Sequence, residues 1–434
     1  MTTATSDIAH LLRRTGFGGS APQIAALAAL NLPQVVDQVL NDASAPPPAQ
    51  PGFVTDANLG DWERWQALGN WWFDRMAGAP VPLVEKATLF WHGHITAAHE
   101  KVGDVELLWQ MHNVQRTNAL GNIKTLAQAC FVTPAMLLYL DNADNVKTSP
   151  NQNFARELLE LFLLGVGNYS ETDVDACALA WSGHNYDDDT KQYVFRADKH
   201  DFGPKTFMGV TRNWNGPELV DFLFTDPTQQ VKVATHLSRR LWSFFAHPSP
   251  PANVVTDLAN IMITSGFEMK PVLKAIFLRP EFYVSTAKQG LVRSPIEFLA
   301  AVMKATGVRS PDASPMQHAE GLGQEPFNPP NVSGWRPNKY WLSAGTAGEK
   351  ASWAQNLHWH MHEDSRDIFR DLPAMPLPQA VDTLLSRVGI TEVSDNSKAV
   401  VTKWLTQQRA SNQGWFETFG LTVLVMLLPE LQLA

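Results

Sequence analysis

The segment NQNFARELLELFLL, residues 151–164, is the clearest helical stretch of the chain. At about 100° per residue, its polar side chains fall within an arc of about 100°, and these are Asn153, Arg156, Glu157 and Glu160. An ordinary surface helix has a wider polar side. We therefore expect this helix to be packed on most of its circumference, with its polar stripe facing a groove, an internal network or a narrow strip of solvent.

Apolar residues recur at helical spacing through most of the remaining sequence. The exception is 187–210, where a turn of three aspartates precedes short extended runs, and this pattern indicates a small hairpin. We predict a mainly α fold, a large multi-helix body with one small antiparallel β-hairpin near 187–210. About half of the residues should be helical, above the ~30–35% that is typical.

The length of 434 residues corresponds to two or three domains at ~100–200 residues each. We place the division after the hairpin. The N-terminal helical part, 1–214, then carries the central segment and the hairpin, and the C-terminal helical part is 215–434. We expect the two parts to form one compact unit.

Composition excludes several classes of protein. Charged residues are 18% of the chain, below the ~25% of an average globular domain, and the net charge is −9. Without a basic stripe, nucleic acid is not expected as a partner. The most apolar stretch, Leu421–Leu428, is too short to span a bilayer, so we expect no membrane association. Residues 1–7 lack the features of a secretory signal, and we expect a cytoplasmic protein.

The polar stripe of 151–164 combines two carboxylates, a guanidinium and an amide. In a groove, Glu157 and Glu160 are suited to acid–base catalysis or to holding a cation, and Asn153 and Arg156 to binding a substrate. The alternative is a structural network in which Arg156 pairs with Glu160 at i,i+4.

Two histidines occur close together in Phe90-Trp91-His92-Gly93-His94. On a helix their side chains point about 200° apart and cannot share a metal ion. His94 lies on the apolar face with Trp91, so we select it as a candidate metal ligand. The alternative is a hydrogen-bonded histidine in the core.

The segment KHDFGPK, residues 199–205, places three chemically active side chains in one tight turn. A histidine beside an aspartate forms an acid–base pair or contributes to a metal site. His200 and Asp201 are therefore candidate catalytic residues, and Lys205 is a candidate substrate-binding residue. A rigid loop further on presents Trp335, which is suited to stacking on a sugar ring or to filling a core.

Short sequence motifs give no further guidance. The GFGG run at 16–19 lacks the preceding strand and following helix of a dinucleotide-binding fingerprint, so we predict no phosphate site there. The sequence contains no serine nucleophile elbow, kinase signature set or zincin motif.

Six segments, in order along nearly the whole chain, resemble the bacterial family called domain of unknown function 1800. They are HLLRRTGFG (10–18), LFWHGHI (89–95), the long block TPAMLLYLDNADNVKTSPNQNFARELLELFLLGVGNYSETDV (133–174), HDFGPKTFMG (200–209), LRPEF (278–282) and PPNVSGW (329–335). The usual family block reads PNxNYARELxEL. Here Phe154 replaces its tyrosine, Phe162 stands where many members have histidine, Leu163 replaces threonine, and His184 displaces a tryptophan.

The resemblance implies a largely α-helical protein with no generally assigned activity. Many relatives look exported, and their genes often neighbour a sulfatase-like family, domain of unknown function 1501. A sulfatase-like companion protein is therefore the expected partner. The departure at His184 makes this residue a candidate substitute metal ligand.

Two classes of function follow from these observations. The first is a hydrolase, either metal-assisted or acting on a glycan, with catalytic residues Glu157, Glu160, His200 and Asp201, and with a divalent metal held by His94 and His184. The second is a non-catalytic partner or scaffold protein, in which the same polar groups lock helices together. If Glu157, His94 and His200 do not converge in one pocket, the enzyme hypothesis fails.

Overall fold

The computed structural model describes residues 3–41, 47–80, 82–363, 368–411 and 414–434. Helices make up 64% of the protein, with 23 α-helices in the described ranges and two small antiparallel two-stranded sheets. The prediction of a mainly α fold is confirmed, and the helical content exceeds the predicted half.

The helices fall into three groups along the chain. The first group is α1 (Thr5–Arg14), α2 (Ala21–Ala28), α3 (Leu32–Asn41), α4 (Asp61–Gly78), α5 (Pro82–His94), α6 (His99–Val102), α7 (Val105–Asn118), α8 (Ile123–Phe131), α9 (Pro134–Tyr139) and α10 (Asn153–Glu157). The second group is α11 (Glu171–Trp181), α12 (Gly216–Thr225), α13 (Gln229–Phe245), α14 (Ala252–Thr264) and α15 (Met269–Leu278). The third group is α16 (Pro295–Thr306), α17 (Ser310–Ala313), α18 (Pro315–Leu322), α19 (Ala344–Glu363), α20 (Leu377–Arg387), α21 (Asp395–Ala410), α22 (Gly414–Met426) and α23 (Pro429–Gln432).

Shorter helical turns join these elements. The 3₁₀ turns are η1 (Gly52–Thr55), η2 (Asn142–Asp144), η4 (Ala197–Lys199), η5 (Pro280–Phe282), η6 (Asn338–Trp341) and η7 (Leu372–Ala374). The segment η3 (Leu158–Leu163) is a π-helix that continues α10 directly.

The region predicted to hold one hairpin contains two. Strand β1 (His184–Asp187) pairs with β2 (Gln192–Phe195), and β3 (Lys205–Phe207) pairs with β4 (Val210–Arg212). The second hairpin closes through Met208 and Gly209, which both have positive φ, at 49° and 80°. Positive φ at both central residues is the geometry of a tight two-residue hairpin turn. The extended run beginning at Lys205 therefore turns back on itself instead of pairing with the first hairpin.

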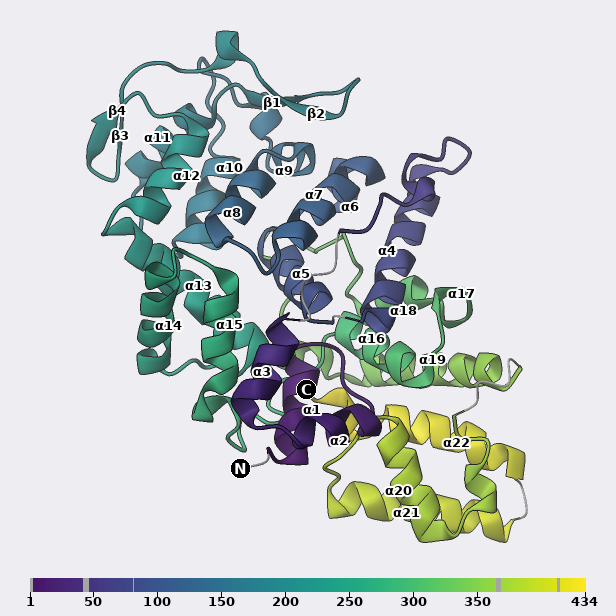
Figure 1. Cartoon of the computed structure of the whole chain (residues 1–434). Helices are drawn as coiled ribbons and strands as arrows, with labels where there is room; N and C mark the ends of the chain where they lie inside the picture. Colours follow the sequence, from purple (N-terminus) through teal and green to yellow (C-terminus); the bar gives the residue numbers. More distant parts are fainter. Residues whose placement is uncertain (1–2, 42–46, 81, 364–367, 412–413) are drawn as a thin grey trace.

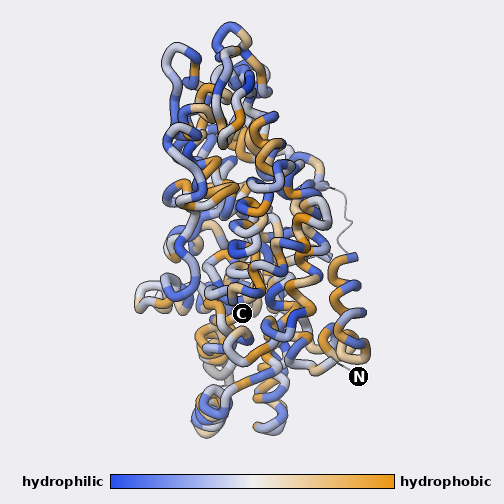
Figure 2. Tube along the Cα trace, turned by 90° about the vertical axis from the view of Figure 1, so that its left-hand side faces the viewer, coloured by the Kyte–Doolittle hydropathy of each residue, from blue (hydrophilic) through white to orange (hydrophobic). Residues whose placement is uncertain are grey.

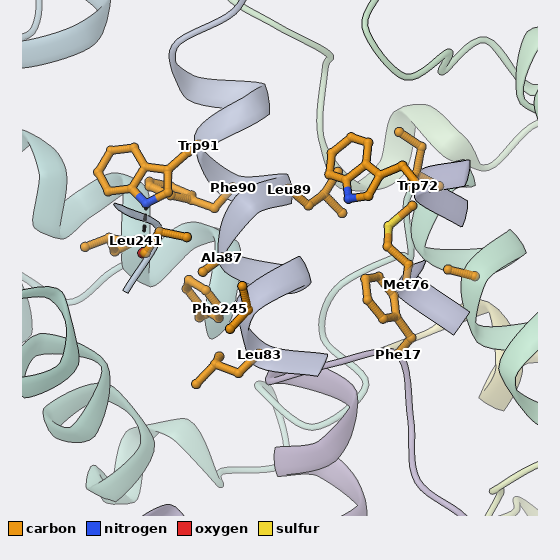
Figure 3. Packing of buried hydrophobic residues seen from close by; sticks show 14 of the residues in the cluster. Phe17, Trp72, Met76, Leu83, Ala87, Leu89, Phe90, Trp91, Leu241 and Phe245 are labelled. Atoms are coloured by element: carbon orange, nitrogen blue, oxygen red, sulfur yellow. Dashed lines mark hydrogen bonds between the residues drawn. The ribbon is translucent and has the colours of Figure 1, made fainter. Parts of the chain in front are cut away.

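Helix α5 runs through the middle of the molecule and organises the core (Figures 1 and 3). Figure 3 shows Phe90 and Trp91 of α5 on the side where Leu241 and Phe245 of α13 lie, and Leu89 toward Trp72 of α4. The hairpins lie at one end of the molecule above α9–α11, and α20–α22 lie at the opposite end below α1 and α2 (Figure 1).

A buried carboxylate on α5 is surrounded by hydrogen-bond donors from two neighbouring helices. The side chain of Glu85 is fully buried, and its two oxygens accept hydrogen bonds from Trp72, Arg75 and Arg116 at 2.9–3.2 Å. Because buried charges need partners, this network ties α4, α5 and α7 together.

Contacts also join the regions before and after the predicted division near residue 214. The ring of His10 hydrogen bonds to Phe282 O at 3.0 Å, Arg14 donates to Ala287 O at 3.0 Å, and the indole of Trp65 donates to Pro326 O at 3.1 Å. The position of the domain boundary stays a prediction.

The hydropathy of the residues agrees with this packing. Apolar stretches run along helices throughout the body, whereas the loops at the hairpin end are mainly hydrophilic (Figure 2). Within the described ranges, no helix combines the length and the apolar character needed to cross a bilayer.

Candidate functional site

The central segment forms a helix that changes type halfway. Residues Asn153–Glu157 are α-helical, and Leu158–Leu163 form a π-helix that ends with Leu164 N–H donating to Leu159 O at 2.9 Å. A π-helix is rare and often marks a functional site. A regular 100° wheel therefore describes only the first half of this segment.

Two histidines from other helices hold the end of the π-helix. His94 of α5 donates through Nε2 to Phe162 O, and His236 of α13 donates to Leu161 O, both at 2.9 Å. Gly165 then ends the helix with φ of 82°, and a Cβ there would lie 2.8 Å from the His236 ring. The last carbonyls of a helix have no partner within it, and these two rings supply one.

The surroundings of His94 make it a structural hydrogen-bond donor. The residue is buried, and its ring stacks on Phe90 with centroids 5.5 Å apart. Burial lowers the pKa of His94 well below its usual value, and the positive charge of Arg240 acts in the same direction. A neutral ring that donates through Nε2 corresponds to the alternative we considered, a hydrogen-bonded histidine in the core.

The ion pair expected within the stripe does not form. Arg156 makes two hydrogen bonds to Glu171, at 2.9 and 2.7 Å, and Glu160 instead accepts a short hydrogen bond from the Tyr169 hydroxyl. Ser170 caps α11 and Glu171 is its first residue, so the turn after Gly165 brings this acid beside Arg156. The predicted Arg156–Glu160 pair is therefore wrong.

Glu157 differs from its neighbours because its carboxylate has no hydrogen-bond partner among the described residues. The residue is half-buried. Burial raises the pKa of Glu157, the nearby charge of Glu160 adds to the rise, and Arg156 opposes it. The charge of Glu157 in turn helps to raise the pKa of Tyr139, which is raised mainly by burial. Glu157 therefore acts electrostatically on the buried Tyr139 of α9.

Asn153 anchors the start of α10 to a second small network. Its amide donates to Asp141 at 2.9 Å, and the other oxygen of Asp141 pairs with Lys101 at 2.7 Å. Asp141 adopts φ of 60°, a left-handed conformation that Asp tolerates better than most residues. Asn153, predicted to bind substrate, is thus engaged in holding the loop before α10.

The hairpin end gathers a second group of predicted residues. His200 donates through Nδ1 to Ser182 O at 2.8 Å, and His184 hydrogen bonds to the Tyr193 hydroxyl at 2.8 Å. The two imidazole centroids are 6.2 Å apart. Burial lowers the pKa of His184 to about 3, and His200 contributes further.

Asp201 and Lys205 bind each other, which removes the predicted His200–Asp201 acid–base pair. The buried ammonium of Lys205 donates to Asp201 O at 2.6 Å, to Gly203 O at 2.7 Å and to Asp201 Oδ1 at 3.1 Å. Burial alone would raise the pKa of Asp201, but the hydrogen bonds from Lys205 and Gly203 outweigh it and lower the pKa. All three donor positions of Lys205 are used within its own loop.

Trp335 lies in a third place, against the end of α5. Its ring is half-buried and 5.6 Å from that of His92. The loop approaches closely because Gly334, with φ of 75°, packs on Gly93, where a Cβ would lie 2.5 Å from the Gly93 carbonyl oxygen. Trp335 therefore covers the end of α5.

The predicted site residues thus occupy three separate places: the central segment with His94, the hairpin end, and the loop of Trp335. The hydrogen bonds and ring contacts of His94 and of His200 have no residue in common, and the Glu157 carboxylate makes no hydrogen bond within the described residues. Within the described part of the chain, no three His, Cys, Asp or Glu side chains are placed to hold a metal ion together. The expected metal site combining His94 and His184 with the carboxylates is not formed.

Two residues that the sequence did not single out are central to this region. The buried Asn142 donates to Trp181 O and His184 O, and the buried Asn145 donates to Asn142 and to Ala178 O. They join the loop before α10 to the hairpin end. The signal was present as two asparagines in DNADN, because this residue type hydrogen bonds readily to nearby backbone.

Comparison with known proteins gives one match. The family described as protein of unknown function (DUF1800) matches residues 10–433, which is nearly the whole chain, and this confirms the resemblance seen in the motifs. Neither the curated proteins nor the solved structures contain a match.

Proposed function

The chain belongs to the DUF1800 family, and because the family's function is unknown, we propose from the geometry that it is a non-catalytic partner protein. The observation that carries this proposal is the dispersal of the candidate catalytic groups. His94 and His200 are bound in separate networks, the Glu157 carboxylate has no hydrogen-bond partner among the described residues, and nearly every other polar side chain of the predicted site is bound within its own local network.

A surface at the hairpin end supports binding to another protein. Phe195 and Phe202 are 42% and 60% exposed, and their rings lie 5.1 and 4.6 Å from that of His200. Adjacent exposed aromatic side chains are typical of interaction sites. Below them, the bonds of Lys205 and Asn142 fix the loops, so the surface is already ordered before a partner binds.

The sulfatase-like companion expected from the resemblance is the partner to test. We would measure its binding to the full chain and to the double variant Phe195→Ser/Phe202→Ser. Binding should weaken at least tenfold, since aromatic residues dominate interface energetics. Trp62→Ser is the matched control, because Trp62 is 63% exposed on α4 and should leave binding unchanged. No binding by the unaltered chain, or equal binding by the double variant, would reject this partner surface.

The hydrolase built on Glu157, His94 and His200 together fails the test of convergence in one pocket, so the second candidate is a hydrolase that uses Glu157 without either histidine. A half-buried carboxylate with a raised pKa and no hydrogen-bond partner in the described structure has the character of a general acid. A screen of ester and glycoside substrates would compare the unaltered chain with Glu157→Gln, using Glu171→Gln as control. Turnover that only Glu157→Gln abolishes would establish a hydrolase and refute the non-catalytic proposal.

A further inference from the structure

Positive charge accumulates beneath the GFGG loop, far from the hairpin end. The cationic seam, as we name it, consists of five side chains that are each at most 6% exposed: Arg13, Arg14, Lys86, Arg293 and Lys350. They come from the end of α1, from α5, from the residues before α16 and from α19. Their charges depress one another's pKa, with burial as the larger cause; the pKa of Arg293, for example, falls to about 10.

Negative charge does not balance this seam. Glu297 accepts a short hydrogen bond from Lys86 and also acts on Arg14 and Arg293. Glu392 acts on Arg13 from an exposed position. Glu430 is already bound by Ser394 and Ser397. The cations therefore outnumber the carboxylates that reach them.

Several donors in the seam also lack an acceptor within the described residues. They are Nε and Nη2 of Arg13, Nε of Arg14 and Nη1 of Arg293, all of them buried. A buried donor without an acceptor costs about 1–3 kcal/mol, and more when it is charged. Buried charges are normally paired, so this arrangement calls for an acceptor that carries negative charge.

A cavity of about 150 Å³ borders the seam at Arg293, one of the residues with an unpaired donor. Arg293, Lys304 and Arg387 line it together with Gly18, Gly19 and Ser20. The volume is well above the ~10–15 Å³ that a single water needs. Arg387 is bound to Asp371, and Lys304 donates to Gly18 O at 2.7 Å, so both cations are held at the wall of the cavity.

The glycine-rich loop adds backbone donors at the same place. It leads directly into α2, and the N–H groups of Gly19, Ser20 and Ala21 have no acceptor among the described residues. The N-terminus of a helix carries partial positive charge and favours anions, phosphate in particular. Together with the buried Arg293, this gives the cavity two independent kinds of anion donor.

A second cavity lies next to the first, and its walls are mainly apolar. It measures about 160 Å³ and shares Gly18, Gln23 and Lys304 with the anion cavity. Its remaining walls are mainly aliphatic, contributed by Leu12, Leu27, Val39, Pro82 and Leu83. A ligand that fills both cavities has an anionic group at one end and a small apolar group at the other.

We propose that this pair of cavities binds a small phosphate ester, with the phosphate group held by Arg293, Lys304, Arg387 and the N–H groups of Gly19 and Ser20. Arginine and helix N-termini suit phosphate because both present several donors to its oxygens. The apolar group of the ester lies against Leu12, Leu27 and Leu83. This site is independent of the proposed partner surface at the hairpin end.

Calorimetric titration and thermal unfolding of the full chain would test the site with inorganic phosphate and with butyl phosphate. Phosphate should bind saturably and raise the Tm, whereas sodium chloride at equal ionic strength should not. Butyl phosphate should bind more tightly than inorganic phosphate. Chloride and phosphate with equal effects would overturn the site, and equal affinity for the two phosphates would overturn its apolar half.

Variants test whether Lys304 and Arg293 bind the phosphate. Lys304→Gln should raise the Kd for phosphate at least tenfold, and Lys304→Arg should restore binding, because the charge returns. Arg293→Gln should abolish saturable binding if it folds. Lys124→Gln removes one charge from α8, where Lys124 pairs with Asp221, and should bind normally. Unchanged affinity in Lys304→Gln would refute the assignment whether or not Arg293→Gln folds.

Discussion

The hairpin end and the cationic seam bury polar groups in opposite ways. At the hairpin end and along α10, nearly every charged or polar side chain has a partner, such as Lys205 with its three acceptors and Arg156 with Glu171. In the cationic seam, five cations share few carboxylates, and four guanidinium nitrogens have no acceptor in the described structure. A satisfied network fixes a fold, whereas a group of unsatisfied buried donors calls for an explanation, and the proposed phosphate ligand supplies one. The difference therefore separates structural from functional polar groups better than residue type does.

Removal of the Glu297 carboxylate should have the largest effect on the free energy of unfolding. Glu297→Gln removes a major counter-charge of the seam and leaves Lys86 without its partner. Breaking a buried pair on one side typically costs about 3–5 kcal/mol, so the free energy of unfolding should fall by this amount in urea denaturation. The double variant Lys86→Met/Glu297→Gln should recover much of the loss. A loss below about 1 kcal/mol would mean that the seam is not short of negative charge.

At the hairpin end, Lys205→Met should lower the free energy of unfolding by about 1–3 kcal/mol, because it leaves three acceptors without their shared donor. Urea denaturation measures this loss. Lys199→Met is the control, since Lys199 lies six residues away in sequence with its side chain 52% exposed. If both variants were equally stable, the hairpin loops would not depend on this ammonium.

Acid should destabilise the hairpin end and the π-helical segment, because His184 and His94 are buried there. Burial lowers the folded-state pKa of His94 and of His184, so the unfolded chain alone takes up protons as the pH falls below about 6.5. Each histidine then reduces the free energy of unfolding by about 1.4 kcal/mol per pH unit. This reduction is absent above pH 6.5 and grows as the pH falls toward the folded-state pKa.

The variant His184→Phe isolates one of these contributions. Between pH 6.5 and 5, its unfolding free energy should depend less steeply on pH than that of the unaltered chain, by the amount due to one histidine. Denaturation series at each pH measure the two slopes. Parallel slopes would show that His184 is protonated in the folded protein as readily as in the unfolded one.

Lys350→Met should have the smallest effect and the opposite sign to Lys205→Met. Lys350 is also buried, but within the described structure it makes only one hydrogen bond, to Gln432 at 2.5 Å, and it lies near the positive charge of Arg293. Replacing a poorly compensated buried ion by an apolar group is often neutral or stabilising. In phosphate-free buffer we expect a gain of zero to about 1 kcal/mol in thermal or urea unfolding. A fall in the free energy of unfolding as large as that of Lys205→Met would show that the hairpin end and the cationic seam do not differ in this respect.

The sequence predicted the fold class well because helical periodicity is a local property. The spacing in 151–164 indicates a helix correctly, and the extended runs after Asp187 indicate strands in the right region. The π-helix could not be predicted from the sequence, because its last carbonyls are bound by His94 and His236, 68 and 75 positions away in sequence. Tertiary contacts of this kind leave no trace in local spacing.

The site was harder to predict because partners are chosen in three dimensions. An i,i+4 rule selected Glu160 for Arg156, but the turn at Gly165 places Glu171 closer. The GFGG run showed no phosphate context in sequence, since no strand precedes it. In the structure that context comes from Arg293, Lys304 and Arg387, more than 270 positions away.

The π-helical turn at 158–163 also constrains how this segment can evolve. One turn of π-helix holds more residues than a turn of α-helix, so deleting a single residue here would allow an ordinary α-helix to close. Everything downstream would then rotate by about 100°, and Leu161 O and Phe162 O would no longer face the two imidazoles that bind them. The length of this segment is therefore constrained as well as its buried side chains. Among descendants of this gene, single-codon insertions and deletions should therefore be purged here while remaining common in the exposed loops.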